Sequence, residues 1–405
     1  MDERAWFRRT VVLTLLAGLC GTASAQQVNT FPKRDDPLHV RAAMFDELMR
    51  GNHWNEGVMM QHVVFPPAGK ETPICGSQED CPFHTGGYLA GLAFRYAVTK
   101  DPKVREYADK TLDGILKLEA VTGQRGCIAR SFNKTDKPNW HEKVYFFPNE
   151  WHASTAMPGY RWMGDLSTDQ FTGLVFGLMC YWELCADDAH KQVAAGFVDR
   201  MVGRCVDNNF KIVDSDNKMT LWGNCCPDLP HENFNALLIL SHLKTAHRMT
   251  GKPRYLAAYE RLIADRGYDD EAILAKVLWP EEWRNGSDDH LAAMALYHLM
   301  RIETDPSLAQ KYRMSLNRHW YLWKDKPGLV FYRMLYQVLA GQDVVGEQTV
   351  EAIKGMWGFD RNRRSWTIPG PDGPQTLEAE EEGNAAFMLR DYWFGRYYGI
   401  IDPEW

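Results

Sequence analysis

The stretch YLAGLAFRYAVTKDPKVREYADKTLDGILKL, residues 88–118, decides the fold because it contains one complete helical hairpin. Its first part is almost entirely apolar over about four turns, which predicts a helix that is buried on all sides. The segment TKDP supplies a tight turn. The second part has apolar residues on one side only, as expected of a helix that covers the first one.

Three further segments repeat this pattern, beginning at Phe171, Phe234 and His290, with turns that read ADDA, TGKP and ETDP. Less regular copies begin at Pro327 and at Ala385, and the last one pairs with the opening helix PLHVRAAMFDELM. Inner helices that are apolar all round, each with a one-sided outer helix, form a two-layered ring. The pattern predicts an all-α fold, an (α/α)6 toroid of six helical hairpins, as a single domain over residues 26–405.

Residues 1–25 have the composition of a secretory signal peptide. MDERAWFRR precedes the apolar run TVVLTLLAGLCG, and Ala23-Ser24-Ala25 provides the small residues of a cleavage site. The apolar run is too short to cross a bilayer, and no later segment reaches the length that a membrane helix needs. We therefore expect a protein without a membrane span, exported to the periplasm or the medium.

The composition argues against nucleic acid as a partner, and the cysteine count suits an oxidising compartment. A net charge of −7 without a Lys/Arg block argues against a nucleic-acid surface. Cys20 belongs to the signal peptide, and an even number of cysteines in an exported chain predicts disulfides, although sequence alone does not choose among the pairings. The remaining cysteines are Cys75, Cys81, Cys127, Cys180, Cys185, Cys205, Cys225 and Cys226.

The connections between hairpins indicate where a site lies. Turns from inner to outer helices are a few residues long, whereas the connections from outer helices to the next inner helices are long. Long ordered loops in a compact domain usually carry function. We therefore expect a pocket at the N-terminal ends of the inner helices.

In architecture and hairpin pattern the chain resembles the six-hairpin glycosidase superfamily over nearly the whole mature length. The resemblance implies a glycoside hydrolase, an unsaturated uronyl hydrolase, a polysaccharide lyase or a sugar epimerase. Within that group it is weakly similar to the unsaturated glucuronyl hydrolases, which typically place an Asp after a His near the first inner-helix entry. In FHTGGYLAG, however, Thr85 follows His84.

Acidic residues near the inner-helix starts are the candidates for catalysis. Hydrolysis of a glycosidic bond usually needs two carboxyl groups, about 5 to 10 Å apart, on either side of the bond. Helices of different hairpins that converge on one pocket can supply such a pair. The candidate catalytic residues are Asp165, Asp169, Glu232, Asp288 and Asp289.

Each of these acids also has a structural interpretation. Ser167-Thr168-Asp169-Gln170 fits a capping box, in which the acid complements the helix dipole. Ser287 can cap the helix that follows it, which leaves the two following acids as dipole-matching residues. Glu232 can be another helix-start acid, and Asp165 a solvated loop acid.

Aromatic and basic side chains in the same loops are the candidates for substrate binding. Flat aromatic rings stack on pyranose rings, and Arg binds a carboxylate with two hydrogen bonds, which indicates an acidic sugar such as a uronate. The candidate substrate-binding residues are His84, Trp151, His152, Arg161, Trp162, Trp222, His231, Trp283, Arg284 and His290, with Arg125 and Arg130 as further arginines on this face.

We expect neither a metal nor a cofactor. The Cys and His residues at positions 75–84 and 225–231 lack the CxxC pairs of a zinc site, and residues 214–217 lack the Gly and Glu of a calcium loop. The expected partner is an oligo- or polysaccharide. Two alternatives stay open: a lyase or epimerase that uses His or Tyr as a base with Arg to neutralise the acid, and a non-catalytic glycan-binding protein, which Thr85 in place of an acid would suit.

Overall fold

The computed structural model describes residues 31–65, 75–77, 79–136, 141–142, 151–226, 233–358, 361–368 and 372–405. The predicted signal peptide, His231 and Glu232 lie outside these ranges. The described part contains thirteen α-helices, and none of them is long and apolar enough to cross a membrane.

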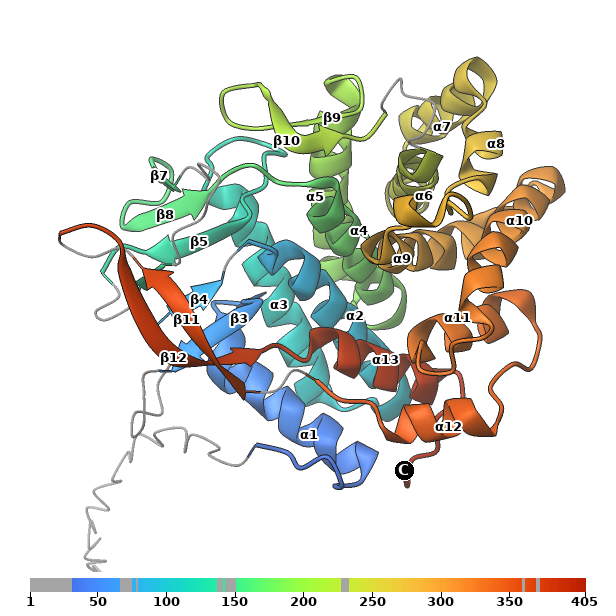
Figure 1. Cartoon of the computed structure of the whole chain (residues 1–405). Helices are drawn as coiled ribbons and strands as arrows, with labels where there is room; N and C mark the ends of the chain where they lie inside the picture. Colours follow the sequence, from blue (N-terminus) through green and yellow to red (C-terminus); the bar gives the residue numbers. More distant parts are fainter. Residues whose placement is uncertain are drawn as a thin grey trace, which may run out of the picture.

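Six helices form an inner ring (Figure 1), and each contacts the next in the order α13, α2, α4, α6, α9, α11 and back to α13. An outer helix packs against each of them. The inner helices are α2 (Cys81–Thr99), α4 (Thr168–Leu184), α6 (Asn233–Thr250), α9 (Gly286–Ile302), α11 (Val330–Ala340) and α13 (Ala386–Tyr397). The outer helices are α3 (Pro102–Ala120), α5 (Asp188–Asp207), α7 (Pro253–Arg266), α10 (Pro306–Trp323), α12 (Glu347–Lys354) and α1 (Leu38–Leu48), and a further helix, α8 (Tyr268–Ile273), follows α7. The predicted ring of six hairpins is confirmed.

Burial follows the pattern that predicted the two layers. Every residue of α4 from Gln170 to Tyr181 is buried, as expected of a helix surrounded by protein. In α7 only Tyr255, Ala258, Tyr259 and Leu262 are buried, which is a single stripe. The inner helices therefore form the core and the outer helices cover it.

Glycines bring three inner helices into backbone contact. A Cβ atom on Gly173 of α4 would lie 2.7 Å from the Cα atom of Phe83 in α2, and one on Gly86 of α2 would overlap the carbonyl group of Gly173. On the other side of α2, a Cβ atom on Gly91 would lie 3.2 Å from the backbone nitrogen of Arg390 in α13. Helices α4, α2 and α13 therefore form an arc of closely spaced helices. A larger residue in place of these glycines would disrupt that close spacing.

The opening helix closes the ring. Asp46 of α1 is buried and accepts hydrogen bonds from the Tyr88 hydroxyl at 2.8 Å and from Nη1 of Arg95 at 2.6 Å, both on α2. The backbone nitrogen of His39 donates to the carbonyl oxygen of Trp405 at 2.8 Å. The first and last described segments are thereby held together.

The long connections contain strands, which the sequence did not indicate. One sheet has the order β11 (Arg361–Ile368), β12 (Gln375–Gly383), β3 (His62–Phe65), β4 (Cys75–Ser77) and β6 (His141–Glu142), and another has the order β5 (Ser131–Lys134), β8 (Tyr160–Met163) and β7 (Trp151–Ala153). Two pairs complete the set: β1 (Trp54–Asn55) with β2 (Val58–Met59), and β9 (Lys211–Val213) with β10 (Met219–Asn224). In Figure 1 the two larger sheets lie together at one side of the helical ring.

The predicted disulfides do not appear in the described part of the chain. The seven cysteines whose side chains are described are Cys81, Cys127, Cys180, Cys185, Cys205, Cys225 and Cys226, and all are buried free thiols. Cys75 has no described side chain.

Candidate active site

The start of α9 places one acid of the candidate pair. Asn285, rather than the predicted Ser287, caps this helix, because its side-chain oxygen accepts from the backbone nitrogen of Ser287 at 3.1 Å. The side-chain nitrogen of Asn285 donates to Oδ1 of Asp288 at 2.8 Å. An amide has both a donor and an acceptor, so the same residue caps the helix and orients the acid.

The start of α4 places the second acid. The predicted capping box is present: the side chains of Ser167 and Gln170 bond reciprocally to each other's backbone, and the Gln170 oxygen lies 3.2 Å from the Ser167 nitrogen. Asp169 lies between them in the first turn and is exposed. The structural and catalytic interpretations of this stretch are therefore compatible.

Electrostatics connects the two acids. Burial raises the pKa of Asp288 to about 6; Lys276 opposes this shift, and the negative charges of Asp169 and Asp289 add to it. The pKa of Asp169 is also raised: its side chain reaches solvent, but the surrounding protein desolvates the carboxyl group, and the charge of Asp80 adds to the effect. A carboxyl whose pKa is about 6 is still partly protonated near neutral pH, so Asp288 can donate a proton there.

Asp289 has a different role from its neighbour. Its Oδ1 atom lies 2.7 Å from Nζ of Lys276, and only 4% of the Lys276 side chain is exposed. Lys276 also donates to the carbonyl oxygen of Asn285 at 3.2 Å. A buried lysine needs such a partner, and we therefore interpret Asp289 as the counter-ion that fixes Lys276 next to Asp288.

Aromatic rings and two histidines gather between the starts of α2, α9 and α13. The ring of Phe387 lies 4.4 Å from that of His290, 4.8 Å from that of Phe83 and 5.0 Å from that of His84, measured between centroids. The Tyr332 ring lies 6.3 Å from His290. We call Phe83, His84, His290, Tyr332 and Phe387 the aromatic floor.

The two histidines of the aromatic floor are neutral. Burial lowers the pKa of His84 to about 3. Burial also lowers the pKa of His290 far below its ordinary value, and Arg390, whose Nη1 lies 2.6 Å from Nε2 of His290, adds to this effect. Because an arginine can only donate, His290 accepts at Nε2, which fixes its tautomer.

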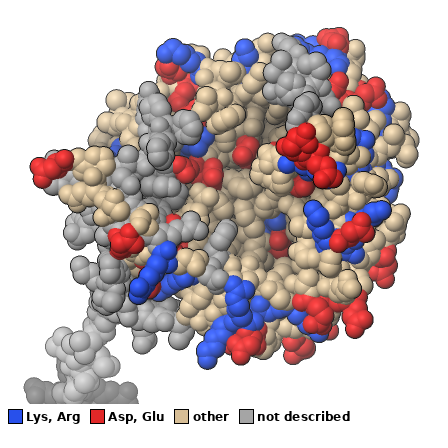
Figure 2. All heavy atoms as spheres, viewed as in Figure 1, with Lys and Arg blue, Asp and Glu red and all other residues tan. Residues whose placement is uncertain are grey.

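The floor is partly accessible to solvent. Phe83, His290, Tyr332 and Phe387 are half-buried, although the protein strongly desolvates His290. Groups that solvent reaches but protein surrounds are expected at the bottom of a depression. Figure 2 shows a hollow near the middle of the face in view, with acidic side chains around and within it, and Figure 1 places α2, α4, α9 and α13 behind this hollow.

Asp165 connects the loop before α4 to the neighbouring connections. Its backbone φ is +63°, its backbone nitrogen donates to Oδ2 of Asp214 at 2.6 Å, and its Oδ1 accepts from the backbone nitrogen of Leu221 at 2.7 Å. Arg130 donates to its carbonyl oxygen. With its carboxylate engaged by β10, Asp165 is placed as a positioning residue.

Four candidate binding residues form one cluster on β7 and β8. The rings of His152 and Trp162 lie 4.5 Å apart, and the Arg161 guanidinium lies 5.4 Å from the Trp151 ring. Trp162 is only 4% exposed, so it supports the sheet and does not present a face to a ligand.

The remaining candidates are dispersed or outside the described residues. Trp222 on β10 is 62% exposed. Arg284 donates to the carbonyl oxygen of Leu278 and to Glu281, so its own loop occupies it. The side chain of Trp283 is not described, and neither are His231 and Glu232. Arg125 is 77% exposed and lies 3.9 Å from Asp199, against α5.

Arg390 and Asp391 are site residues that the sequence analysis missed. Nη2 of Arg390 lies 2.5 Å from Oδ1 of Asp391, and the guanidinium carbon lies 3.7 Å from the Phe331 ring centroid. The signal was present, because an Arg-Asp pair interrupts the apolar run of an inner helix, where charged residues have to be paired.

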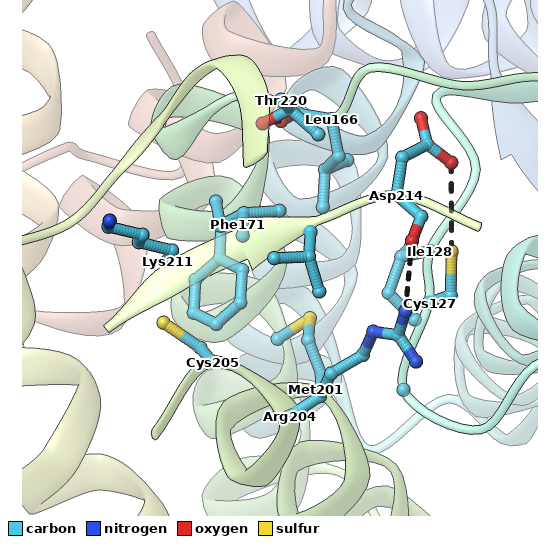
Figure 3. A pocket seen from close by; sticks show the side chains of 13 residues that line it. Cys127, Ile128, Leu166, Phe171, Met201, Arg204, Cys205, Lys211, Asp214 and Thr220 are labelled. Atoms are coloured by element: carbon cyan, nitrogen blue, oxygen red, sulfur yellow. Dashed lines mark hydrogen bonds between the residues drawn. The ribbon is translucent and has the colours of Figure 1, made fainter. Parts of the chain in front are cut away.

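A second depression lies under β9 and β10 (Figure 3), where Cys127 points toward Asp214, with sulfur and oxygen 3.9 Å apart. Nη2 of Arg204 donates to the carbonyl oxygen of Asp214 at 2.9 Å. The enclosed volume is about 10 Å³, which is room for one water molecule at most. This depression is a packing feature and not a substrate site.

Among the residues that the structure describes, no group of three or more His, Cys, Asp or Glu side chains is placed to hold a metal ion.

No family model matches the chain, and no curated protein matches it. Among solved structures it is similar to a sugar epimerase from a ruminal bacterium (TM-score 0.48, 11% identity, 79% of this chain and 88% of the other). It is also similar to a Bacteroides ovatus GH9 structure (0.43, 10%, 84% and 77%) and to the unsaturated glucuronyl hydrolase of Bacillus sp. GL1 (0.32, 12%, 89% and 94%). The fold itself is established by the closed ring of helix contacts described above.

Proposed function

We propose that this protein is a carbohydrate-active enzyme that hydrolyses a glycosidic bond. The observation that carries the proposal is the pair of acids Asp288 and Asp169, which interact electrostatically. They lie at the starts of α9 and α4, two inner helices that contact each other although α6 lies between them in the ring order. Glycoside cleavage requires two carboxyl groups on either side of the bond, one of which holds a proton that it can donate.

The two acids would have distinct roles. Asp288, whose pKa burial raises to about 6, would protonate the leaving glycosidic oxygen. Asp169 would act from the other side of the bond, as the nucleophile or as the base that activates water. The half-buried rings of the aromatic floor would stack on the sugar. Export to the periplasm or the medium is part of this proposal.

The test is product release by the purified protein from a panel of oligosaccharides. Wild type should release reducing ends, and Asp288→Asn and Asp169→Asn should each lower kcat by at least about 100-fold, in line with the contribution of general acid–base groups. Asp343→Asn, in an exposed loop, serves as the matched control. Saturable binding without turnover in all four proteins would instead support a glycan-binding protein.

A second candidate function uses the aromatic floor. His84 and His290 are two neutral imidazoles on one surface with Arg390 beside them, and this favours proton abstraction next to a carbonyl or carboxylate, as in an epimerase or a lyase. An epimerase would exchange a substrate proton with deuterated water without releasing reducing ends. A lyase would produce an unsaturated product that absorbs in the ultraviolet.

A further inference from the structure

A cavity adjoins the candidate active site behind the start of α13. Its volume is about 230 Å³, and its lining comes from the 356–358 segment and from α13 with the two residues before it. The described lining residues are Met356, Trp357, Gly358, Asn384, Ala385, Phe387, Met388 and Asp391. Roughly seven water molecules of about 30 Å³ each would fill this volume, and a pyranose ring with its hydroxyls is of similar size.

The cavity and the aromatic floor share a wall. Phe387 lines the cavity, and its ring also lies 4.4 Å from the ring of His290. Arg390 connects the same two places, because its guanidinium contacts both His290 and Asp391. A glycan whose scissile bond lies over the floor would therefore place a neighbouring unit at this cavity.

The polar groups of the cavity reduce to one carboxyl. Asn384 is occupied, because its side-chain nitrogen donates to the Met60 carbonyl at 3.0 Å and its oxygen accepts from the Ala386 nitrogen at 3.1 Å. Arg390 contacts Asp391 at Oδ1, through Nε at 2.7 Å and Nη2 at 2.5 Å. Among the side chains of the described lining, this leaves Oδ2 of Asp391, whose side chain is 17% exposed, as the oxygen that can accept hydrogen bonds from a ligand.

The charges of the site argue against an acidic ligand. The described lining of the cavity contains one carboxyl group, that of Asp391, and no lysine or arginine. Two arginines lie against the ring of the lining residue Trp357: the guanidinium carbon is 4.9 Å from the ring centroid for Arg34 and 5.8 Å for Arg41. Arg41 donates to the carbonyl oxygens of Met356 and Lys354, and Arg390 holds Oδ1 of Asp391. Inside the cavity a uronate carboxylate would face the Asp391 carboxylate with no cation among the described lining residues to bind it.

We propose that this cavity is a subsite for one neutral pyranose unit of the glycan, whose hydroxyl groups donate to the Asp391 carboxylate while its apolar face packs against the apolar side chains of the lining. The inference rests on the proposed function and specifies its substrate class. It departs from the expectation of a uronate, which the arginines of the pocket loops had suggested.

The test compares matched ligands. Neutral tetrasaccharides, and the same tetrasaccharides oxidised to a uronate at the terminal unit, are titrated calorimetrically into wild type, Asp391→Asn, Met388→Phe and the control Asp343→Asn. Wild type and the control should bind the neutral tetrasaccharides at least about tenfold more tightly than the uronate forms. Asp391→Asn should weaken neutral binding by about tenfold or more, as expected on loss of a charged hydrogen bond. Met388→Phe should weaken the binding of neutral tetrasaccharides, because the larger side chain reduces the volume of the cavity.

The possible outcomes separate the subsite from the catalytic proposal. Equal affinities in wild type, Asp391→Asn and Met388→Phe would overturn the subsite, as would tighter binding of the uronates or no binding of any tetrasaccharide. Met388→Phe keeps every charge, so it remains informative if Asp391→Asn does not fold. Full turnover by Asp288→Asn would overturn the catalytic proposal and leave the binding result intact. For a substrate that is cleaved, Asp391→Asn should raise KM with little effect on kcat.

Discussion

Replacing Asp288 by Asn should stabilise the folded protein at neutral pH while it removes turnover. In the folded state burial and neighbouring acids raise the pKa of this carboxyl to about 6, whereas an unfolded chain has an Asp pKa of about 3.9. The folded state therefore binds the proton more tightly than the unfolded state. The free energy of unfolding has to fall as the pH rises from about 4 to about 6, and the deficit persists at higher pH.

The magnitude follows from the shift. A difference of about two pKa units corresponds to roughly 3 kcal/mol at 1.36 kcal/mol per unit. Asp288 is partly accessible to solvent, which screens its interactions. We therefore expect a gain of about 1 to 2 kcal/mol for Asp288→Asn at pH 8, and about half that gain at pH 5, where the folded carboxyl is mostly protonated.

The measurement is urea unfolding of wild type, Asp288→Asn and Asp343→Asn at both pH values. Buried histidines also change the stability with pH, but they are common to the three proteins and cancel in the differences. The control should match wild type. Two results would refute the electrostatic reasoning. One is an Asp288→Asn protein that is less stable than wild type at pH 8. The other is a difference in the free energy of unfolding that is the same at both pH values.

Three further predictions follow from the same structure. The kcat/KM of wild type should fall as the pH rises above about 6, because Asp288 then loses the proton that it donates, and a flat alkaline limb would argue against this role. Gly173→Ala should cost about 3 kcal/mol or more in urea unfolding because its Cβ meets the backbone of α2, whereas Gly196→Ala on α5, whose Cβ has room, should gain about 0.5 to 1 kcal/mol. Burial lowers the pKa of His242 to about 3, so the stability contributed by its neutral ring is complete above pH 6.5 and is lost on acidification. When the pH falls from 7 to 5, the free energy of unfolding should therefore drop by up to about 2 kcal/mol less in His242→Gln than in wild type, as measured by urea unfolding.

The hairpins could be predicted because their signal is local. A helix that is buried all round and a helix with one apolar stripe have different patterns within a single segment, and the short turns join them in order. The strand pair β11–β12 was missed because its residues do not alternate between apolar and polar. Arg361 and Arg363 pair instead with Glu382 and Glu380 across the two strands, so charge complementarity replaces the apolar face.

The candidate site was predicted in part. The inner-helix starts gave Asp169 and Asp288, because first-turn acids are visible in sequence. The distinction between Asp288 and its neighbour required the position of Lys276, which comes from the connection before α9. Asp165 could not be assigned a framework role from the sequence, because its contact with Leu221 joins residues that are far apart in the chain.

The glycine contacts among α4, α2 and α13 divide the ring into two mechanically different halves. Backbones in contact leave no side chains that could change rotamer and let these helices separate. Amide hydrogens of α2 should therefore exchange with deuterium at the rate of global unfolding. An enzyme of this architecture that adapts to a wider ligand would have to move α6, α9 and α11, and Asp288 would move with α9. The glycine-linked half, which carries Asp169 and borders the cavity behind α13, would stay fixed.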